Sequence, residues 1–314
     1  MIVRFGLDAL RSVCDDAGVD WPPPLLVASP RRPVPVEAVR RWSEVPSGRV
    51  EEAAAQAEGG VVALGGGSAI DLGKAISAVA GVPLVSIPTT YSGAEWTTYY
   101  GVRDPGRKLL GGGAGAHPAG IVYDAGLTLD LPRETTVGTA MNALAHCAEA
   151  LYVEGRNDDA DAHALAGAQL IGEWLPRVVD APRDREARTE LLRGACHGGA
   201  ALGGSGLALA HAMAQAVGGR YGLPHGTLNA ICLAPALRWN EQWAPEAVAR
   251  FRKAVGRDVE TLAALGGVTR LHELGVPEDD LAELAESAAG RPGNRANPRP
   301  AEPAEIEELL RSVY

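Results

Sequence analysis

The chain has 314 residues, of which 46% are hydrophobic and 22% are charged. This length allows one large or two medium-sized domains with cores of their own, and the composition is that of a globular protein. The net charge of −10 argues against broad binding to a nucleic-acid backbone. It does not exclude a nucleotide, because a few backbone N–H groups can hold phosphate in an acidic protein.

The cysteines and the N-terminus indicate the kind of protein. None of the four cysteines forms a CxxC pair, so neither a zinc knuckle nor a dithiol redox motif is expected. The N-terminal residues lack the basic-then-apolar pattern of a signal peptide, and no run of about 18 apolar residues occurs. We therefore predict a cytoplasmic protein that binds neither membrane nor nucleic acid.

In the first 130 residues, short β-rich runs alternate with helical patterns. Ser68 is expected to cap the second helix, with Asp71 at its third position, where a carboxylate suits the positive end of the helix dipole. Such alternation predicts a parallel α/β layer. The predicted strands are 25–28, 60–64, 83–88 and 120–124, and the predicted helices are 50–58 and 68–80.

Beyond Pro132 strand signals are scarce and Ala/Leu-rich helical patterns follow one another. We therefore predict an α/β nucleotide-binding domain over residues 1–132 and an all-α substrate domain over 133–314, with the ligand in a cleft between them. A loop is predicted at 291–303. The predicted helices are 134–153, 158–179, 185–219, 224–239, 245–255, 259–265, 277–289 and 303–312.

The glycine run Gly65, Gly66 and Gly67 leads from a predicted strand into the helix near Ser68. Backbone without Cβ atoms can approach a pyrophosphate, and the helix would direct free N–H groups at the anion. The run is not a GxGxxG fingerprint, and a tight strand-to-helix turn without a ligand is the alternative.

A second group of polar residues follows the strand at 83–88. Thr89, Thr90 and Ser92 could bind phosphate, ribose or the nicotinamide amide, or bond to the loop's own backbone. Further on, Lys108 could reach a ribose or phosphate, or lie at a solvated hairpin tip.

The helical part contains spaced imidazoles and amides. Asn142 and His146 lie four residues apart, as do His211 and Gln215, and His225 begins a predicted helix. This spacing places each pair on one helix face. A lone histidine in an apolar helix is usually a core residue, but three in matching contexts favour a site that binds a metal or polarises a carbonyl.

Other candidates in the helical part have weaker patterns. Glu149, one turn beyond His146, is expected to orient that imidazole, with an ordinary exposed charge as the alternative. Cys147 is assigned to the core. Four histidines lack a partner pattern and are interpreted as surface or structural residues: His117, His163, His197 and His272.

Segments along nearly the whole chain resemble the iron-containing alcohol dehydrogenase superfamily, most closely its maleylacetate reductase branch. The segments are GGGSAIDLGKAIS, IPTTYSGAEWT, VYDAGLTLDLP, GTAMNALAHCAEALY, HAMAQAVGGRYGLPHGTLNA and the late NPRP. The resemblance implies a dehydroquinate-synthase-like two-domain fold. It also implies NAD(P) in the cleft, hydride transfer to a carbonyl, and a homodimer.

The resemblance also bears on a metal. Metal-dependent members carry an aspartate and three histidines, and the matching positions here are Asn142, His146, His211 and His225. Maleylacetate reductases tend to have asparagine at the first position and are regarded as not needing the metal. A metal is therefore doubtful, and those four residues would be its ligands if one were bound.

The chain departs from the family at three places. Gln215 replaces a histidine expected near the nicotinamide, and an amide cannot titrate near neutral pH. Ala94-Glu95-Trp96 stands where the branch tends to have Ser-Glu-Met, and residues 109–116 contain four glycines. Arg31 and Arg32 follow a strand end that has no acidic residue, which favours tolerance of NADPH.

We therefore predict an NADH- or NADPH-dependent reductase of a small oxo-acid or enone-acid. A metal-dependent (iron or zinc) alcohol dehydrogenase and a non-redox protein on the same scaffold are the alternatives. The predicted catalytic residues are His146, His211, His225, Asn142 and Gln215. The predicted cofactor-binding residues are Gly65, Gly66, Gly67, Ser68, Asp71, Thr89, Thr90, Ser92 and Lys108.

Overall fold

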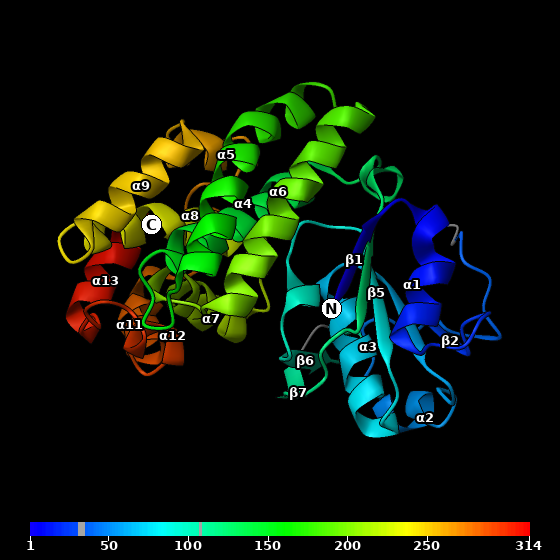
Figure 1. Cartoon of the computed structure of the whole chain (residues 1–314). Coiled ribbons are helices and arrows are strands. Elements are labelled where there is room, and N and C mark those ends of the chain that lie inside the picture. The colour runs from blue at the N-terminus through cyan, green and yellow to red at the C-terminus, as the bar shows by residue number, and fades with distance from the viewer. Residues whose placement is uncertain (31–34, 107–108) are drawn as a thin grey trace. The chain divides into compact units, whose positions relative to one another are not determined.

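The computed structural model describes residues 1–30, 35–106 and 109–314, and the chain divides into two compact units (Figure 1). Unit 1 comprises Met1–Thr90 and Ala94–Thr128, and unit 2 comprises Tyr91–Gly93 and Leu129–Tyr314. The short segment Tyr91–Gly93 therefore packs with the helical unit, although the residues on either side of it belong to the α/β unit.

Unit 1 is built on a six-stranded sheet in the order β1-β8-β5-β4-β2-β3, and every neighbouring pair is parallel. Four of these strands, β2, β4, β5 and β8, confirm the four strands predicted from the sequence. The two at the edges, β1 and β3, were not predicted, because they are short and carry exposed arginines. The strands are β1 (Ile2–Phe5), β2 (Leu25–Ala28), β3 (Arg40–Trp42), β4 (Val61–Gly65), β5 (Leu84–Pro88) and β8 (Gly120–Tyr123).

Helices cover both faces of this sheet. Alternation along a strand turns Leu26 towards α1 (Leu10–Ala17), and its neighbour Leu25 towards α2 (Val50–Ala54) and α3 (Gly67–Ala80). Both residues are fully buried, as a parallel strand with two covered faces requires. Three short 3-10 turns complete the unit: η1 (Leu7–Ala9), η2 (Ala94–Trp96) and η3 (Ala125–Thr128).

Two helix predictions in unit 1 were wrong in detail. The helix predicted over 50–58 ends at Ala54, ahead of Gly59 and Gly60, which both have positive φ. The helix predicted to be capped by Ser68 begins at Gly67 with Gly66 as its N-cap, so Asp71 lies beyond the first turn. Glycine backbone, not a hydroxyl cap, starts α3.

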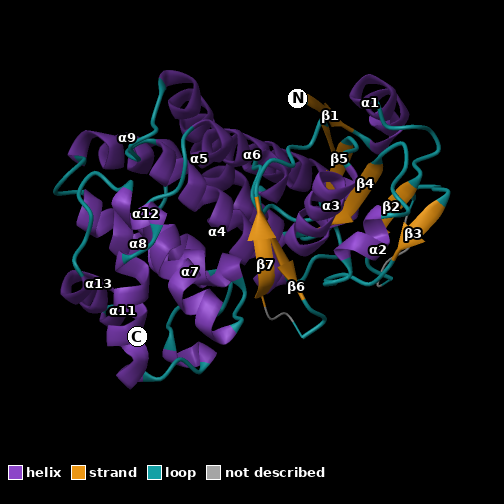
Figure 2. Ribbon diagram, turned by 90° about the horizontal axis from the view of Figure 1, so that it is seen from below, coloured by secondary structure: helices purple, strands orange, loops and turns teal. Residues whose placement is uncertain are grey.

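The glycine-rich segment after residue 108 forms a hairpin strand. β6 (Tyr100–Arg103) and β7 (Leu109–Gly113) pair antiparallel and lie side by side in Figure 2. A Cβ at Gly112 would lie 2.6 Å from the Tyr100 carbonyl oxygen, and one at Gly113 would lie 2.5 Å from the Tyr100 hydroxyl. Two of the unusual glycines are therefore required by contact with Tyr100.

Unit 2 is helical and surrounds the buried helix α4, which packs against α5, α6 and α8 (Figure 1). The helices are α4 (Arg133–Ala150), α5 (Asp158–Asp180), α6 (Arg185–Gly204), α7 (Leu209–Tyr221), α8 (His225–Asn240), α9 (Pro245–Val255), α10 (Val259–Ala264), α11 (Leu281–Ala289), α12 (Pro292–Arg295) and α13 (Pro303–Arg311), with 3-10 turns η4 (His272–Leu274) and η5 (Glu278–Asp280).

The helix predicted over 185–219 is two helices. α6 ends at Gly204 and α7 begins at Leu209, because Gly206 has a φ of +134° that no helix accommodates. The break places His211 in the first turn of α7. The short α12 lies inside the segment predicted as a loop. No helix within the described ranges is long and apolar enough to span a membrane.

Candidate active site

Three of the predicted histidines come together in unit 2. His146 is on α4, His211 on α7 and His225 on α8. The rings of His146 and His211 stack with centroids 4.8 Å apart, and those of His211 and His225 are tilted at 5.5 Å. Residues separated by up to 79 positions in the sequence therefore form one polar cluster.

Asn142 lies at the centre of this cluster. Its Nδ2 donates to the Ser92 carbonyl oxygen at 2.8 Å, which fixes the orientation of the amide. The same nitrogen faces His146 Nε2 at 3.4 Å, and the amide oxygen lies 3.3 Å from His211 Nε2. Asn142 thus links two imidazoles to the backbone of the segment Tyr91–Gly93.

The sequence analysis missed Asn229, a fully buried residue of α8. Its Nδ2 donates to the Asn142 amide oxygen at 2.6 Å and lies 2.9 Å from His225 Nε2. Its own amide oxygen is buried and has no hydrogen-bond partner in the described parts of the chain. The signal was present, because Asn229 follows His225 by the same four residues that separate Asn142 from His146.

Glu149 orients His211, not His146 as predicted. Its side chain is buried, and Oε2 lies 2.6 Å from His211 Nδ1. The other carboxylate oxygen accepts the backbone N–H of His211 at 3.1 Å. Both ring nitrogens of His211 therefore face oxygen atoms, which hold the ring in one orientation.

His146 has a different environment. Burial, followed by the neighbouring His211 and His225, lowers the pKa of His146 well below its ordinary value. Its Nδ1 is buried without a partner among the residues described. Gly93, with φ of +75°, makes room for the ring, since a Cβ there would lie 3.2 Å from His146 Cε1. His146 is therefore neutral at neutral pH.

The other predicted residues either lie at the margin of this cluster or fall outside the residues that the structure describes. Gln215 is half-buried one turn after His211, and its side chain makes no hydrogen bond with any residue that the structure describes. His225 is exposed, unlike the other two histidines of the cluster. Ser92 contributes its backbone carbonyl to Asn142. Lys108, Arg31 and Arg32 lie outside the described residues.

As arranged, the cluster does not fit a metal ion. Among the residues described, no three or more His, Cys, Asp or Glu side chains are placed to hold one. Asn142 brings no charge, its oxygen already accepts from Asn229, and its nitrogen faces the Nε2 atom of His146 that would otherwise be a ligand.

The predicted phosphate site is the N-terminus of α3 in unit 1. Gly65 has a φ of +153°, and a Cβ there would lie 2.6 Å from the Cβ of Ala69. No side chain caps the helix, and the N–H groups of Gly67 and Ser68 find no acceptor in the described part of the chain. The half-exposed glycine turn thus fits a phosphate group.

Asp71 and Lys74, which both lie on α3, bind the neighbouring segment 97–101. Asp71 pairs with Lys74 at 3.2 Å and accepts the Gly101 N–H at 3.2 Å. The fully buried Lys74 also donates to the Tyr99 carbonyl at 2.5 Å and the Thr97 hydroxyl at 3.1 Å. Burial lowers the pKa of Lys74 and raises that of Asp71. Asp71 is therefore engaged with protein groups.

Trp96, which departs from the family pattern, takes part in a chain of hydrogen bonds just before this segment. Its Nε1 donates to the Tyr123 hydroxyl at 2.8 Å, and that hydroxyl donates to Glu95 at 2.6 Å. A methionine at position 96 could not donate this hydrogen bond. Burial raises the pKa of Glu95.

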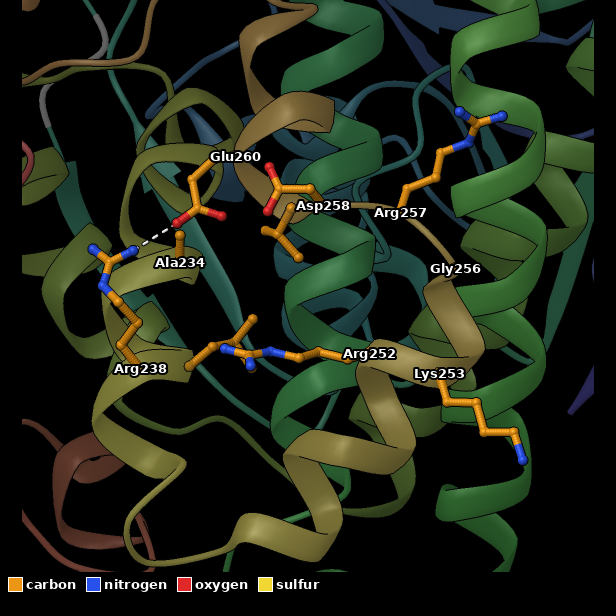
Figure 3. A pocket seen from close by; sticks show the side chains of 10 residues that line it. Ala234, Arg238, Arg252, Lys253, Gly256, Arg257, Asp258 and Glu260 are labelled. Atoms are coloured by element: carbon orange, nitrogen blue, oxygen red, sulfur yellow. Dashed lines mark hydrogen bonds and ion pairs between the residues drawn. The ribbon is translucent and has the colours of Figure 1, made fainter.

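A cavity of about 480 Å³ lies elsewhere in unit 2, between α8, α9 and α10 (Figure 3). Its lining includes none of the predicted site residues. Arg238 is paired with Glu260 at 2.6 Å, and the side chains of Arg252, Lys253 and Arg257 extend in different directions (Figure 3). These cations do not converge on one ligand position.

The chain thus combines a parallel α/β unit, in which a glycine-rich turn starts a helix, with a helical unit that holds a cluster of three imidazoles. The model of the iron-containing alcohol dehydrogenase family matches residues 39–125, and that of the Fe-containing alcohol dehydrogenase family, C-terminal, matches residues 136–314. The chain therefore belongs to the iron-containing alcohol dehydrogenase family and is an oxidoreductase.

Individual relatives include maleylacetate reductases. That of Burkholderia cepacia is 39% identical over 259 residues, covering 81% of this chain and 73% of the relative. That of Sphingobium indicum is 32% identical, covering 98% and 94%. The crystal structure of maleylacetate reductase from Agrobacterium tumefaciens is 32% identical with a TM-score of 0.86, covering 100% of this chain and 95% of that one. The predicted fold class is confirmed.

Proposed function

We propose that the protein is an NAD(P)H-dependent reductase that acts on maleylacetate or a closely similar small oxo-acid. The observation that supports it best is Asn142, an amide hydrogen-bonded at the centre of three imidazoles, where the metal-dependent enzymes of the family carry aspartate. The similarity to maleylacetate reductases over 81–98% of this chain gives the substrate class.

In this proposal, unit 1 binds the cofactor. The backbone around Gly65–Ser68 holds the pyrophosphate, and Thr89, Thr90 and Ser92 bind ribose or the nicotinamide. Asp71 supports this region through its bond to the Gly101 N–H. Bound NAD(P)H supplies the hydride that the reduction needs.

The cluster in unit 2 binds the substrate and supplies the proton. Glu149 holds Nδ1 of His211, so the ring can donate the proton on Nε2, which faces the Asn142 amide oxygen, and regain one without losing its orientation. The exposed His225 binds a substrate carboxylate, and the neutral His146 and Asn142 shape the pocket. Because Gln215 cannot titrate near neutral pH, the proton comes from the imidazoles.

The test is oxidation of NADH and NADPH with maleylacetate, with and without EDTA, on protein whose metal content has been measured. We expect turnover that EDTA does not change, and its loss in His211→Ala and His225→Ala variants that still bind cofactor. Intact reduction in both variants would show that these histidines are not catalytic.

Two other outcomes would favour the alternatives. Activity that requires bound iron or zinc would indicate a metal-dependent alcohol dehydrogenase. Cofactor binding without turnover over a wide panel of carbonyl compounds would indicate a non-redox function on the same scaffold. In either case the proposal of a metal-free reductase would be rejected.

We also propose that the enzyme is cytoplasmic and that it is a homodimer, the second of which the family resemblance implies. Size-exclusion chromatography with light scattering gives the mass directly, against 32.6 kDa for one chain. A monomer at working concentrations would contradict this part of the proposal.

A further inference from the structure

Two histidines that the proposed function does not use lie against each other in unit 2. His163 is on α5 and His197 is on α6, with Nδ1 atoms 2.8 Å apart and ring centroids 5.0 Å apart. His163 is exposed and His197 is half-buried, so solvent reaches the pair. The sequence showed no partner pattern for either histidine, because 34 residues separate them along the chain.

The pair meets because α5 and α6 pack unusually closely; they lie side by side in Figure 1. A Cβ at Gly167 would lie 3.0 Å from the Gly194 carbonyl oxygen and 3.1 Å from the Gly198 nitrogen. His163 is one turn before Gly167, and His197 is next to Gly198. The two imidazoles are therefore held by rigid helices and not by loops.

At 2.8 Å one Nδ1 donates its hydrogen to the lone pair of the other. If a metal ion replaces that hydrogen, both lone pairs can be directed at it. In tetrahedral zinc sites the Zn–N distance is about 2.0–2.1 Å, which separates two nitrogen ligands by about 3.3 Å. The rings therefore need to separate by only about half an ångström, a shift that side-chain rotation supplies.

The cationic side chain of α6 that lies one turn away from the pair is compensated by an ion pair. Arg193, one turn before His197 on α6, is ion-paired with Glu190 at 3.4 Å, which offsets its charge.

We propose that His163 and His197 form a binding site for a first-row transition-metal ion such as Zn²⁺, with water molecules completing the coordination. Imidazole nitrogen is a preferred ligand for these ions. The site is separate in the sequence from the cluster of His146, His211 and His225, and it does not depend on the proposed reaction.

The proposal is tested by calorimetric titration of Zn²⁺ into the chelator-treated full chain. We expect one equivalent that binds to the native protein and is lost in both His163→Ala and His197→Ala. The matched control is His272→Ala, which removes a surface histidine elsewhere in unit 2 and keeps that equivalent. The same zinc stoichiometry and affinity in the native chain and both variants would overturn the proposal.

Two further measurements separate a built site from other causes. Cys196 precedes His197, so loss of zinc binding in Cys196→Ser with retention in His163→Ala would assign the ion to the thiol and overturn the proposal. Zn²⁺ should raise the Tm of the native protein and not that of His163→Ala, because the ion links α5 to α6 in the folded state only. Reduction rates in metal-free buffer should be unchanged in both histidine variants.

Discussion

At the scale of single residues, the cluster depends on Asn142 being an amide. Its nitrogen donates to the Ser92 carbonyl and faces the Nε2 of His146, positions where a carboxylate oxygen would meet two acceptors. Its oxygen accepts from Asn229, as either an amide or a carboxylate could. Asparagine is thus the residue type that lets this arrangement persist by hydrogen bonds alone.

We therefore predict that Asn142→Asp converts the cluster from a hydrogen-bonded site to a metal-binding one. The new carboxylate loses the bond to Ser92 and leaves a buried charge that a cation would neutralise. Elemental analysis should find iron or zinc retained by the variant, and its reductase activity in EDTA should fall at least tenfold. Asn142→Ala, which removes the same hydrogen bonds without adding charge, should not gain metal. A variant with native activity in EDTA would contradict the prediction.

The buried His146 predicts a pH dependence of stability. Its folded-state pKa lies below that of an unfolded histidine, near 6.5, so the unfolded chain binds the extra proton. The stability that this residue contributes is complete above about pH 6.5 and is lost as the pH falls below it, by at most about 1.4 kcal/mol per pH unit. Urea unfolding between pH 7.5 and 5 should show a shallower dependence for His146→Gln. Equal slopes would mean that His146 is not buried in its neutral form.

At the scale of elements, the N-terminus of α3 is where a small change should act on the cofactor. Gly66 has extended backbone that any residue can adopt, and a Cβ there would lie 3.1 Å from Thr90 Cγ2. We predict that Gly66→Ala leaves the Tm within a few degrees and raises the Kd for NAD(P)H tenfold or more, about 1.4 kcal/mol, because a methyl group would occupy the phosphate approach.

Cofactor fluorescence titration measures this effect, and Gly111→Ala is the matched control. Gly111 lies in strand β7, and a Cβ there would meet no atom within 4 Å. Equal affinities in Gly66→Ala and Gly111→Ala would remove the glycine turn from the proposed cofactor site.

Sequence patterns predicted the elements that are buried on both sides. β2 and β4 are continuous apolar runs, and α4 is long and Ala/Leu-rich. Sequence patterns could not predict the break between α6 and α7, because glycines within an apolar pattern leave its periodicity unchanged. The edge strand β3 carries two exposed arginines and has no apolar run to detect.

For the site, helical spacing was enough to find pairs on one helix but not contacts between helices. The four-residue spacing identified Asn142 together with His146, and the same spacing from His225 would have identified Asn229. It could not show that Glu149 on α4 reaches His211 on α7, because that contact depends on how the helices pack. The same reason hid the pair of His163 and His197.

At the scale of the whole molecule, total stability limits how many buried charges can be left unpaired. Domains of this size are stable by only about 5–15 kcal/mol, so one unpaired charge takes a large share of that margin. In unit 1, the ion pair of the fully buried Lys74 with the half-buried Asp71 also fixes Tyr99 and Gly101 by their backbone groups. The integrity of this region therefore depends strongly on Lys74.

We predict that Lys74→Met lowers the free energy of unfolding by about 3–5 kcal/mol, the usual cost of removing one partner from a buried pair. The reason is that the Asp71 carboxyl loses its counter-charge, while Tyr99 and Thr97 lose a donor. Adding Asp71→Asn should recover part of the loss, since a neutral amide needs no counter-charge. Urea unfolding followed by circular dichroism measures both effects. If the double variant lost as much free energy of unfolding as the two single variants together, the two side chains would not act as a pair.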